Sequence, residues 1–224
     1  TGAGVVTPMP AADLCRLVRE AYDPGAAAEL DRRARAGHPV PLDWEDVGPT
    51  AAEEQWDRYL HDHGISTTYA SSQPPVGAVT EHVLQDLIGP DPRIDLKRAT
   101  VLLTPHGSRD SLKLLKADLD AAEFRARTAP RDKQLQADLA AATLAVDEQA
   151  HLGATAVDFS VLVTGTVFDA KRLPEARSAI ESTGDLAQML LREQFRNQAP
   201  AFAAALGIGL RLREHLKITA GKNL

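Results

Sequence analysis

The segment "TPHGSRDS" at Thr104–Ser111 brings several chemically reactive side chains together. Its polar residues include His106, Ser108, Arg109 and Asp110. They fall between a strand pattern and a helical pattern, where the N–H groups of a helix start can bind an anion. A nucleophilic serine at such a turn needs Gly-x-Ser-x-Gly, which is missing. We therefore expect Ser108 to cap the helix and Asp110 to favour its first turn. A small-molecule or phosphate-binding enzyme site at the His106–Asp110 turn is the alternative.

The segment His61-Asp62-His63 combines residue types that bind metal ions. The surrounding pattern predicts a helix that starts at Thr50, with Glu53 as its capping-box partner. On such a helix the two histidines point about 200° apart. Zinc-binding helices place their histidines four residues apart, on one face. We therefore expect no metal site.

No segment predicts a nucleotide site. A phosphate-binding loop needs Gly-x-x-x-x-Gly-Lys followed by Ser or Thr, but Gly221-Lys222 is followed by Asn223. The strand pattern Ala156–Val167 contains only Gly165, without the glycines of a dinucleotide fingerprint. We expect neither catalytic residues nor a cofactor.

The composition argues against several classes of function. The 224 residues include 25 Lys and Arg against 31 Asp and Glu, a formal net charge of −6, whereas nucleic-acid binding requires a basic surface. Cys15 is the only cysteine, so we expect no disulfide within the chain and no thiolate zinc cluster. No run of 18 apolar residues predicts a membrane span. Because the sequence starts at Thr1 without a methionine or a signal-peptide pattern, we expect a piece of a longer protein.

The best candidate for a partner-binding surface is the proline-rich acidic loop "HPVPLDWEDVGPT", His38–Thr50. Within it Trp44 is followed by Glu45 and Asp46, and exposed aromatic side chains dominate many protein interfaces. Trp56 is the other tryptophan. It shares an apolar face of the helix predicted after Thr50, so we expect it in the core.

The order of elements predicts an α+β fold, with a mixed sheet and helices. Residues 1–95 would form an N-terminal α/β part with the proline-rich acidic loop, and residues 96–224 a βααβαβ part. In the second part, two stretches of alternating three- and four-residue apolar spacing predict helices of about 20 residues, each on the order of 30 Å long. A short turn between them makes a long antiparallel helical hairpin inserted between strands. Leu115 and Leu139 should be buried where the helices meet.

The last third of the chain contains "DFSVLVTGTVFDAKRLPEARSAIES" and, after a further strand pattern, "QAPAFAAALGIG". This segment resembles part of the amino-terminal domain of type IV secretion and conjugation ATPases. The earlier stretches "VVTPMPAADLCRLVREAYDP", "WEDVGP" and "GPDPRIDLKRATVLLTPH" are similar to the cytoplasmic part of actinobacterial conjugation-type membrane proteins. Those proteins begin with membrane spans resembling the PrgI family. Walker motifs are missing from the sequence, so no catalytic residue carries over.

The resemblance implies a non-enzymatic scaffold or docking domain of a conjugation or type IV secretion-like membrane complex. Its partner would be the ATPase of that complex or another of its subunits, and direct contact with nucleic acid is not expected. The domain would lie at the cytoplasmic face of the bacterial cell membrane, attached through segments outside this sequence.

Overall fold

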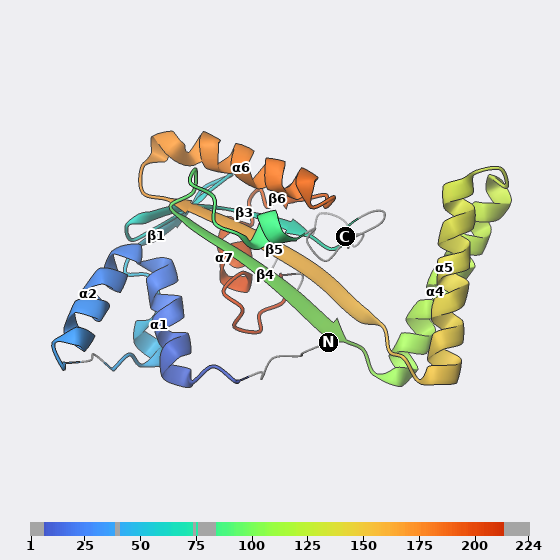
Figure 1. The fold of residues 1–224 in the computed structure, drawn as a ribbon, viewed down its shortest axis with the longest axis horizontal. Coiled ribbons are helices and arrows are strands. Elements are labelled where there is room, and N and C mark those ends of the chain that lie inside the picture. The colour runs from blue at the N-terminus through green and yellow to red at the C-terminus, as the bar shows by residue number, and fades with distance from the viewer. Residues whose placement is uncertain (1–6, 39–40, 74, 76–83, 213–224) are drawn as a thin grey trace. The chain divides into compact units, whose positions relative to one another are not determined.

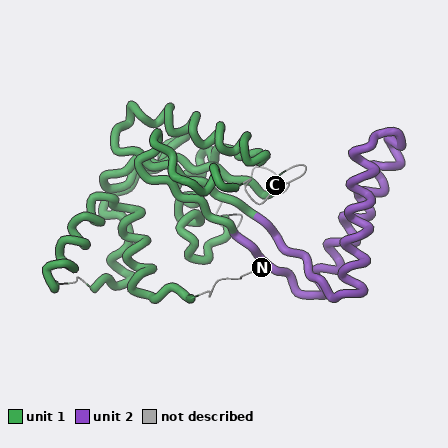
Figure 2. Tube along the Cα trace, viewed as in Figure 1, with its two compact units in different colours: residues 1–101, 160–224 green, residues 102–159 purple. Residues whose placement is uncertain are grey.

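The computed structural model describes residues 7–38, 41–73, 75 and 84–212. By its contacts the chain divides into two compact units (Figure 2). Unit 1 comprises residues 1–101 and 160–224, and unit 2 comprises residues 102–159. Each unit is described by itself. The boundary at residue 95, drawn from the sequence pattern, stays a prediction.

The fold is α+β, as expected, but its sheet is antiparallel and not mixed (Figure 1). The strands are β1 (Ala52–Glu54), β2 (Tyr59–His61), β3 (Gly64–Ser71), β4 (Leu96–Pro105), β5 (Val157–Val167) and β6 (Arg192–Glu193). They follow the order β1-β2-β3-β5-β4, and β6 pairs with β3. Neighbours β1, β2 and β3 are consecutive in sequence, so short turns join them, and such connections produce antiparallel pairs.

The helices of unit 1 lie before, between and after these strands. They are α1 (Ala11–Tyr22), α2 (Pro24–Arg35), α3 (Gln85–Ile88), α6 (Leu173–Leu186) and α7 (Gln198–Ala204), with the 3₁₀ turns η1 (Trp44–Asp46) and η2 (Ala170–Arg172). Helices α6 and α7 both contact β3, and Figure 1 shows them on opposite sides of the sheet.

The helix predicted from Thr50 onward is wrong, because this stretch forms β1, β2 and the turn into β3. The turn residue Asp62 has a φ of 40°, which aspartate tolerates better than most residues. Its Oδ1 accepts the backbone N–H groups of Thr50 and Ala51, each at 2.9 Å. Local turn chemistry therefore decides the structure here, whereas the spacing of apolar residues suggested a helix.

The face of the sheet toward α1 and α7 is packed with aromatic rings. Phe202 of α7 is fully buried, and its ring centroid lies 4.6 Å from that of His61 and 5.1 Å from that of Tyr22. Further buried members of this core are Cys15, Val18, Ala21, Val47, Tyr59 and Leu206. Three of the ten Phe, Trp and Tyr residues meet at this one place, together with His61, so a chain with few aromatic residues still has an aromatic core.

On the opposite face, α6 lies close against the sheet. Ala176, Ala179 and Ile180 are fully buried. A Cβ at Gly165 of β5 would come within 3.0 Å of Cδ1 of Ile180. The glycine in this strand therefore provides space for a helix.

A row of hydroxyl groups runs between β3 and β5 on the α7 side. Ser66 lies opposite Thr166 and Thr68 opposite Thr164, with oxygen–oxygen distances of 2.7 and 3.0 Å. These four residues, called the hydroxyl row below, are all buried. Hydrogen bonding within each pair offsets the cost of burying the polar groups.

The buried His61 extends the hydroxyl row toward α1. Its Nδ1 lies 2.6 Å from the carbonyl oxygen of Tyr22, and its Nε2 lies 2.7 Å from Oγ of Ser66. A carbonyl oxygen can only accept, so Nδ1 carries the proton and Nε2 accepts the hydroxyl hydrogen of Ser66. Ser66 in turn accepts from Thr166. Burial lowers the pKa of His61.

Unit 2 contains α4 (Ser108–Thr128) and α5 (Lys133–Leu152), which pack against each other and are called the helix pair below. Within α4 only Ser111, Ala122 and Ala126 are buried, and no residue of α5 is. Leu115 and Leu139 are half-buried, so the expectation that they are enclosed is wrong. Each helix of the pair covers only one side of the other, so part of each apolar face stays in contact with solvent.

Candidate functional site

The residues predicted to bind a partner lie on the surface of unit 1. Trp44, Glu45 and Asp46 form the turn η1, and all three are exposed. Val47 follows them and is buried in the aromatic core. Trp44 is therefore exposed to solvent close to Val47, whose burial fixes the position of the turn. Residues 39 and 40 of the predicted loop lie outside the described residues.

Within unit 2, polar contacts hold the turn at His106 against the start of β5. Nε2 of His106 lies 3.0 Å from Oδ1 of Asp158, and the backbone N–H of His106 donates to the carbonyl of Ala156 at 2.9 Å. The buried Ser111 accepts the N–H of Ala156 at 3.0 Å. Ser108 does not cap α4, since Gly107 occupies the N-cap position without a side-chain bond.

The remaining polar groups of this turn do not converge on a common point. Arg109 and Asp110 are both exposed, and Asp110 faces Lys113 at 3.7 Å. The histidine is already paired with a carboxylate. This arrangement can hold two chain segments together, and it offers little for chemistry on a bound molecule.

The two histidines of the "HDH" segment have separate surroundings. His61 is buried in the hydrogen-bonded chain described above, whereas the exposed His63 lies 2.9 Å from Oδ1 of Asp23. Among the described residues, no group of three or more His, Cys, Asp or Glu side chains could hold a metal ion. The histidines flank a turn, and the turn is what separates them.

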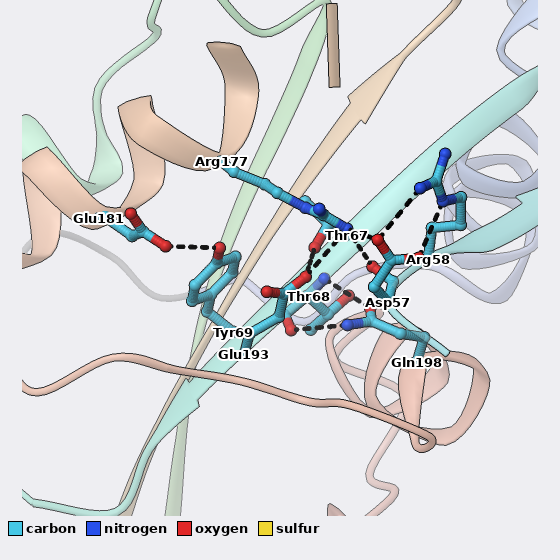
Figure 3. Close-up of polar contacts among 9 residues, drawn as sticks. All are labelled: Asp57, Arg58, Thr67, Thr68, Tyr69, Arg177, Glu181, Glu193 and Gln198. Carbon is cyan, nitrogen blue, oxygen red and sulfur yellow. Dashed lines mark hydrogen bonds and ion pairs between the residues drawn. The ribbon is translucent and has the colours of Figure 1, made fainter. Parts of the chain in front are cut away.

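Sequence reasoning missed a group of interacting charged side chains that joins α6 to residues near β2, β3 and β6 (Figure 3). The guanidinium of Arg177, on α6, pairs with the carboxylate of Asp57 and lies 3.2 Å from Oε1 of Glu193. Arg58 binds the same Asp57 through two nitrogens, at 2.9 and 3.1 Å. Thr67 of β3 donates to Glu193 at 3.1 Å. These five residues are called the polar cluster.

The pKa values of the two carboxylates in the polar cluster are shifted in opposite directions. Hydrogen bonds from Arg58 and Arg177 hold the pKa of Asp57 far below its usual range. Burial raises the pKa of Glu193. Opposed carboxylates of this kind are typical of acid–base catalysis. Here, however, the guanidinium of Arg177 occupies the space between them, so the cluster joins α6 to the strands.

The polar cluster fixes two loops that carry exposed aromatic rings. Trp56 precedes Asp57 in sequence and Phe195 follows shortly after Glu193. The two ring centroids lie 6.0 Å apart, although the side chains are 54% and 47% exposed. The guanidinium carbon of Arg196 lies 4.1 Å from the centre of the Trp56 ring. We call Trp56, Phe195 and Arg196 the aromatic platform.

The backbone that holds the aromatic platform in place includes a residue in an unfavourable conformation. Arg196 has a φ of 61°, an uncommon conformation for a residue with a side chain. Its N–H donates to the carbonyl oxygen of Trp56 at 2.7 Å, which ties the two loops together. Strained residues of this kind often mark functional positions. Tryptophan and arginine are also the residue types that contribute most to protein interfaces.

The aromatic platform corrects the expected role of Trp56. The sequence assigned this residue to a core, but the β-hairpin places it in solvent beside Phe195. The platform joins residues about 140 positions apart, so a reading of local spacing could not find it. The one available signal was the rarity of aromatic residues, which makes any exposed pair unusual.

The comparisons with known proteins give no independent indication of function. No protein-family model, no curated protein and no solved structure matches the chain. In the part of the chain that the structure describes, no helix is long and apolar enough to cross a bilayer.

Proposed function

We propose that this chain is a non-enzymatic docking domain of a conjugation or type IV secretion-like membrane complex, and that it binds the ATPase of that complex. The observation that carries the docking role is the aromatic platform. Two exposed aromatic rings with a stacked arginine, fixed by the partly buried polar cluster, form a rigid surface suited to protein contact. The ATPase as partner rests on the sequence resemblance alone.

The location of the complex also remains a proposal. The resemblance to the cytoplasmic part of conjugation-type membrane proteins favours the cytoplasmic face of a bacterial cell membrane. Attachment would require segments outside this sequence. Trp44, Glu45 and Asp46 offer a second contact surface on the same unit, because they too are exposed.

We further propose that α4 and α5 form the long antiparallel hairpin expected between strands. The helices are 21 and 20 residues long and are joined by only four residues, 129–132. Oδ1 of Asp132 accepts the N–H groups of Gln134 and Leu135, which fixes the start of α5. Exposed Phe124 and Leu144 provide apolar surface for a further contact.

The docking role can be tested by titrating the purified chain into the ATPase encoded in the same gene cluster, using isothermal calorimetry. Trp56→Ala should weaken binding at least about 30-fold, the effect of losing a side chain worth 2 kcal/mol or more. Phe168→Ala is the matched control, because Phe168 is also an exposed aromatic residue of unit 1. This control should leave the affinity unchanged.

Three results would count against this proposal. Binding that is weakened by Trp44→Ala and not by Trp56→Ala would assign the interface to η1. Equal loss in the Phe168→Ala variant would show that no particular surface is used. If the wild-type chain binds no ATPase but forms a dimer by light scattering, the occupant of the platform is a second copy.

A further inference from the structure

Unit 1 has a cavity between α1 and β4 that no proposed function uses. Its volume is about 440 Å³. The apolar side chains of Leu17, Ala21 and Leu96 line part of it, and Arg98 supplies a charged group. A cavity of this size suits a small molecule, since ligand sites combine apolar walls with a few polar groups.

Arg98 is the unusual member of this lining. Its Nη1 is buried, and no hydrogen-bond partner for it is found within the described part of the chain. The guanidinium carbon lies 5.6 Å from the centre of the Phe202 ring. The ring contacts the guanidinium but does not neutralise its charge. Burial lowers the pKa of this arginine. By contrast, the guanidinium of Arg177 has two carboxylate partners.

The other cations of the cavity are already engaged. Arg16 binds Glu20 at 2.6 Å and also pairs with Asp31. Nζ of Lys97 donates to the backbone carbonyl of Asp86 at 2.8 Å. A carbonyl oxygen is neutral, so Lys97 keeps its charge, but its ammonium is held by that bond. Arg98 is the lining cation for which no partner of Nη1 is found among the described residues.

The balance of charge specifies the ligand further. Three cationic residues and two acidic ones, Asp13 and Glu20, line the cavity, which leaves one positive charge. One planar guanidinium matches a carboxylate through two parallel hydrogen bonds. A dianionic phosphate would bring one negative charge more than this balance offsets, and Asp13 would repel it.

We propose that the cavity binds the carboxylate of a small apolar acid, with Arg98 holding the carboxylate and Leu17, Ala21 and Leu96 contacting the apolar body. The carboxylate belongs either to a free aliphatic acid or to the C-terminus of a peptide that ends in an apolar residue. Binding neutralises a buried charge for which the described residues provide no counterion.

The test is a calorimetric and NMR titration of the purified chain with hexanoate, hexanamide and a pentapeptide ending in leucine, with a free or an amidated C-terminus. Hexanoate should bind with a Kd on the order of 1 mM, as expected for so small a ligand. Hexanamide and the amidated peptide should bind at least 10-fold more weakly. Binding of the free-acid peptide alone would assign the site to a chain terminus, and equal binding of hexanoate would assign it to free acids.

Variants separate this role from a structural one. Arg98→Met should reduce hexanoate affinity at least 10-fold without lowering the thermal melting temperature, because it removes an uncompensated charge. Arg98→Lys should reduce the affinity at least 5-fold, because the ammonium cannot form the paired contact. Arg109→Met, an exposed control in unit 2, should bind as the wild type does. Asp13→Asn should tighten binding about 2-fold by removing a nearby negative charge.

Two outcomes would overturn the inference. One is a wild-type chain that binds neither hexanoate nor the free-acid peptide. The other is unchanged affinity in Arg98→Lys, which applies even if Arg98→Met fails to fold. Neither result depends on the ATPase titration, so this site and the docking role can fail separately.

Discussion

In unit 1 the sheet buries aromatic rings on one face and a helix on the other, whereas in unit 2 the helix pair buries three side chains of α4 and none of α5. The apolar spacing in the sequence predicted two regular helices in unit 2. The difference is the number of covered faces. A strand between two helical layers can bury every side chain, but a helix with one neighbour leaves most of its surface in water.

Stability should therefore be distributed unevenly. Unit 1 has a core of close-packed rings and internally paired polar groups, and unit 2 relies on half-buried leucines. The two tryptophans, Trp44 and Trp56, both belong to unit 1. Tryptophan fluorescence thus reports on unit 1 alone, while hydrogen exchange can follow each helix.

The strongest test of this comparison is Phe202→Ala. Phe202 is fully buried among Tyr22, Tyr59 and His61, so the truncation should cost about 3–5 kcal/mol of the free energy of unfolding. Urea denaturation followed by tryptophan fluorescence measures the change. Amide exchange in α4 and α5 should remain close to that of the wild type. A cost below about 1 kcal/mol would mean that the ring is not a core residue.

A smaller effect is expected from Leu115→Ala and Leu139→Ala in the helix pair. Each side chain is half-buried, so each truncation should cost about 1–2 kcal/mol, less than for an enclosed leucine. The local free energy of opening, measured by hydrogen exchange in α4 and α5, is the appropriate quantity. Leu114→Ala, an exposed neighbour, serves as the control. If either truncation cost as much free energy as Phe202→Ala, the two units would not differ in how strongly they are packed.

The smallest expected effect is a pH dependence confined to unit 1. The unfolded imidazole takes up a proton near pH 6.5, but burial lowers the pKa of His61 in the folded state. Below pH 6.5 the unfolded state thus binds more protons, and the free energy of unfolding should fall as the pH is lowered. Above pH 7 the contribution is complete. Each unit by which the pKa of His61 differs between the folded and unfolded states changes the free energy of unfolding by about 1.4 kcal/mol.

This pH effect is isolated by comparison with His61→Gln, which cannot titrate. The difference in stability between wild type and variant, from tryptophan fluorescence at pH 7 and pH 5, should shrink at the lower pH. A constant difference would show that His61 titrates alike in both states.

The sequence predicted regular elements well wherever one pattern continued for many residues. The strand pattern Ala156–Val167 forms β5, and the two stretches of three- and four-residue apolar spacing form α4 and α5. The stretch after Thr50 failed because a short β-hairpin is determined by its turn, here Asp62 with its two backbone hydrogen bonds. Such a bond depends on residues that only the fold brings close.

The candidate site was predictable only in part. Trp44 was expected to be exposed and is, because a proline-rich acidic segment has few ways to be buried. The aromatic platform was not expected, since Trp56 and Phe195 meet through the polar cluster. Arg98 could not be recognised either. Its apolar neighbours in the sequence suggest partial burial, but they cannot show that the described residues provide no counterion for it.

The hydroxyl row has a consequence for how this sequence can diverge. Ser66 and Thr166, and likewise Thr68 and Thr164, form facing pairs across β3 and β5. A single change to valine in the Thr68–Thr164 pair leaves the facing hydroxyl buried without this hydrogen bond, whereas a change of both members leaves an apolar contact. Ser66 also donates to Nε2 of His61, so a change of both Ser66 and Thr166 would leave that nitrogen without its donor. Among descendants of this chain, Thr68 and Thr164 should therefore change together, and Ser66 should change only together with His61. A register shift of two residues would place Thr68 opposite Leu162, so the same pairs also penalise misaligned strands during folding.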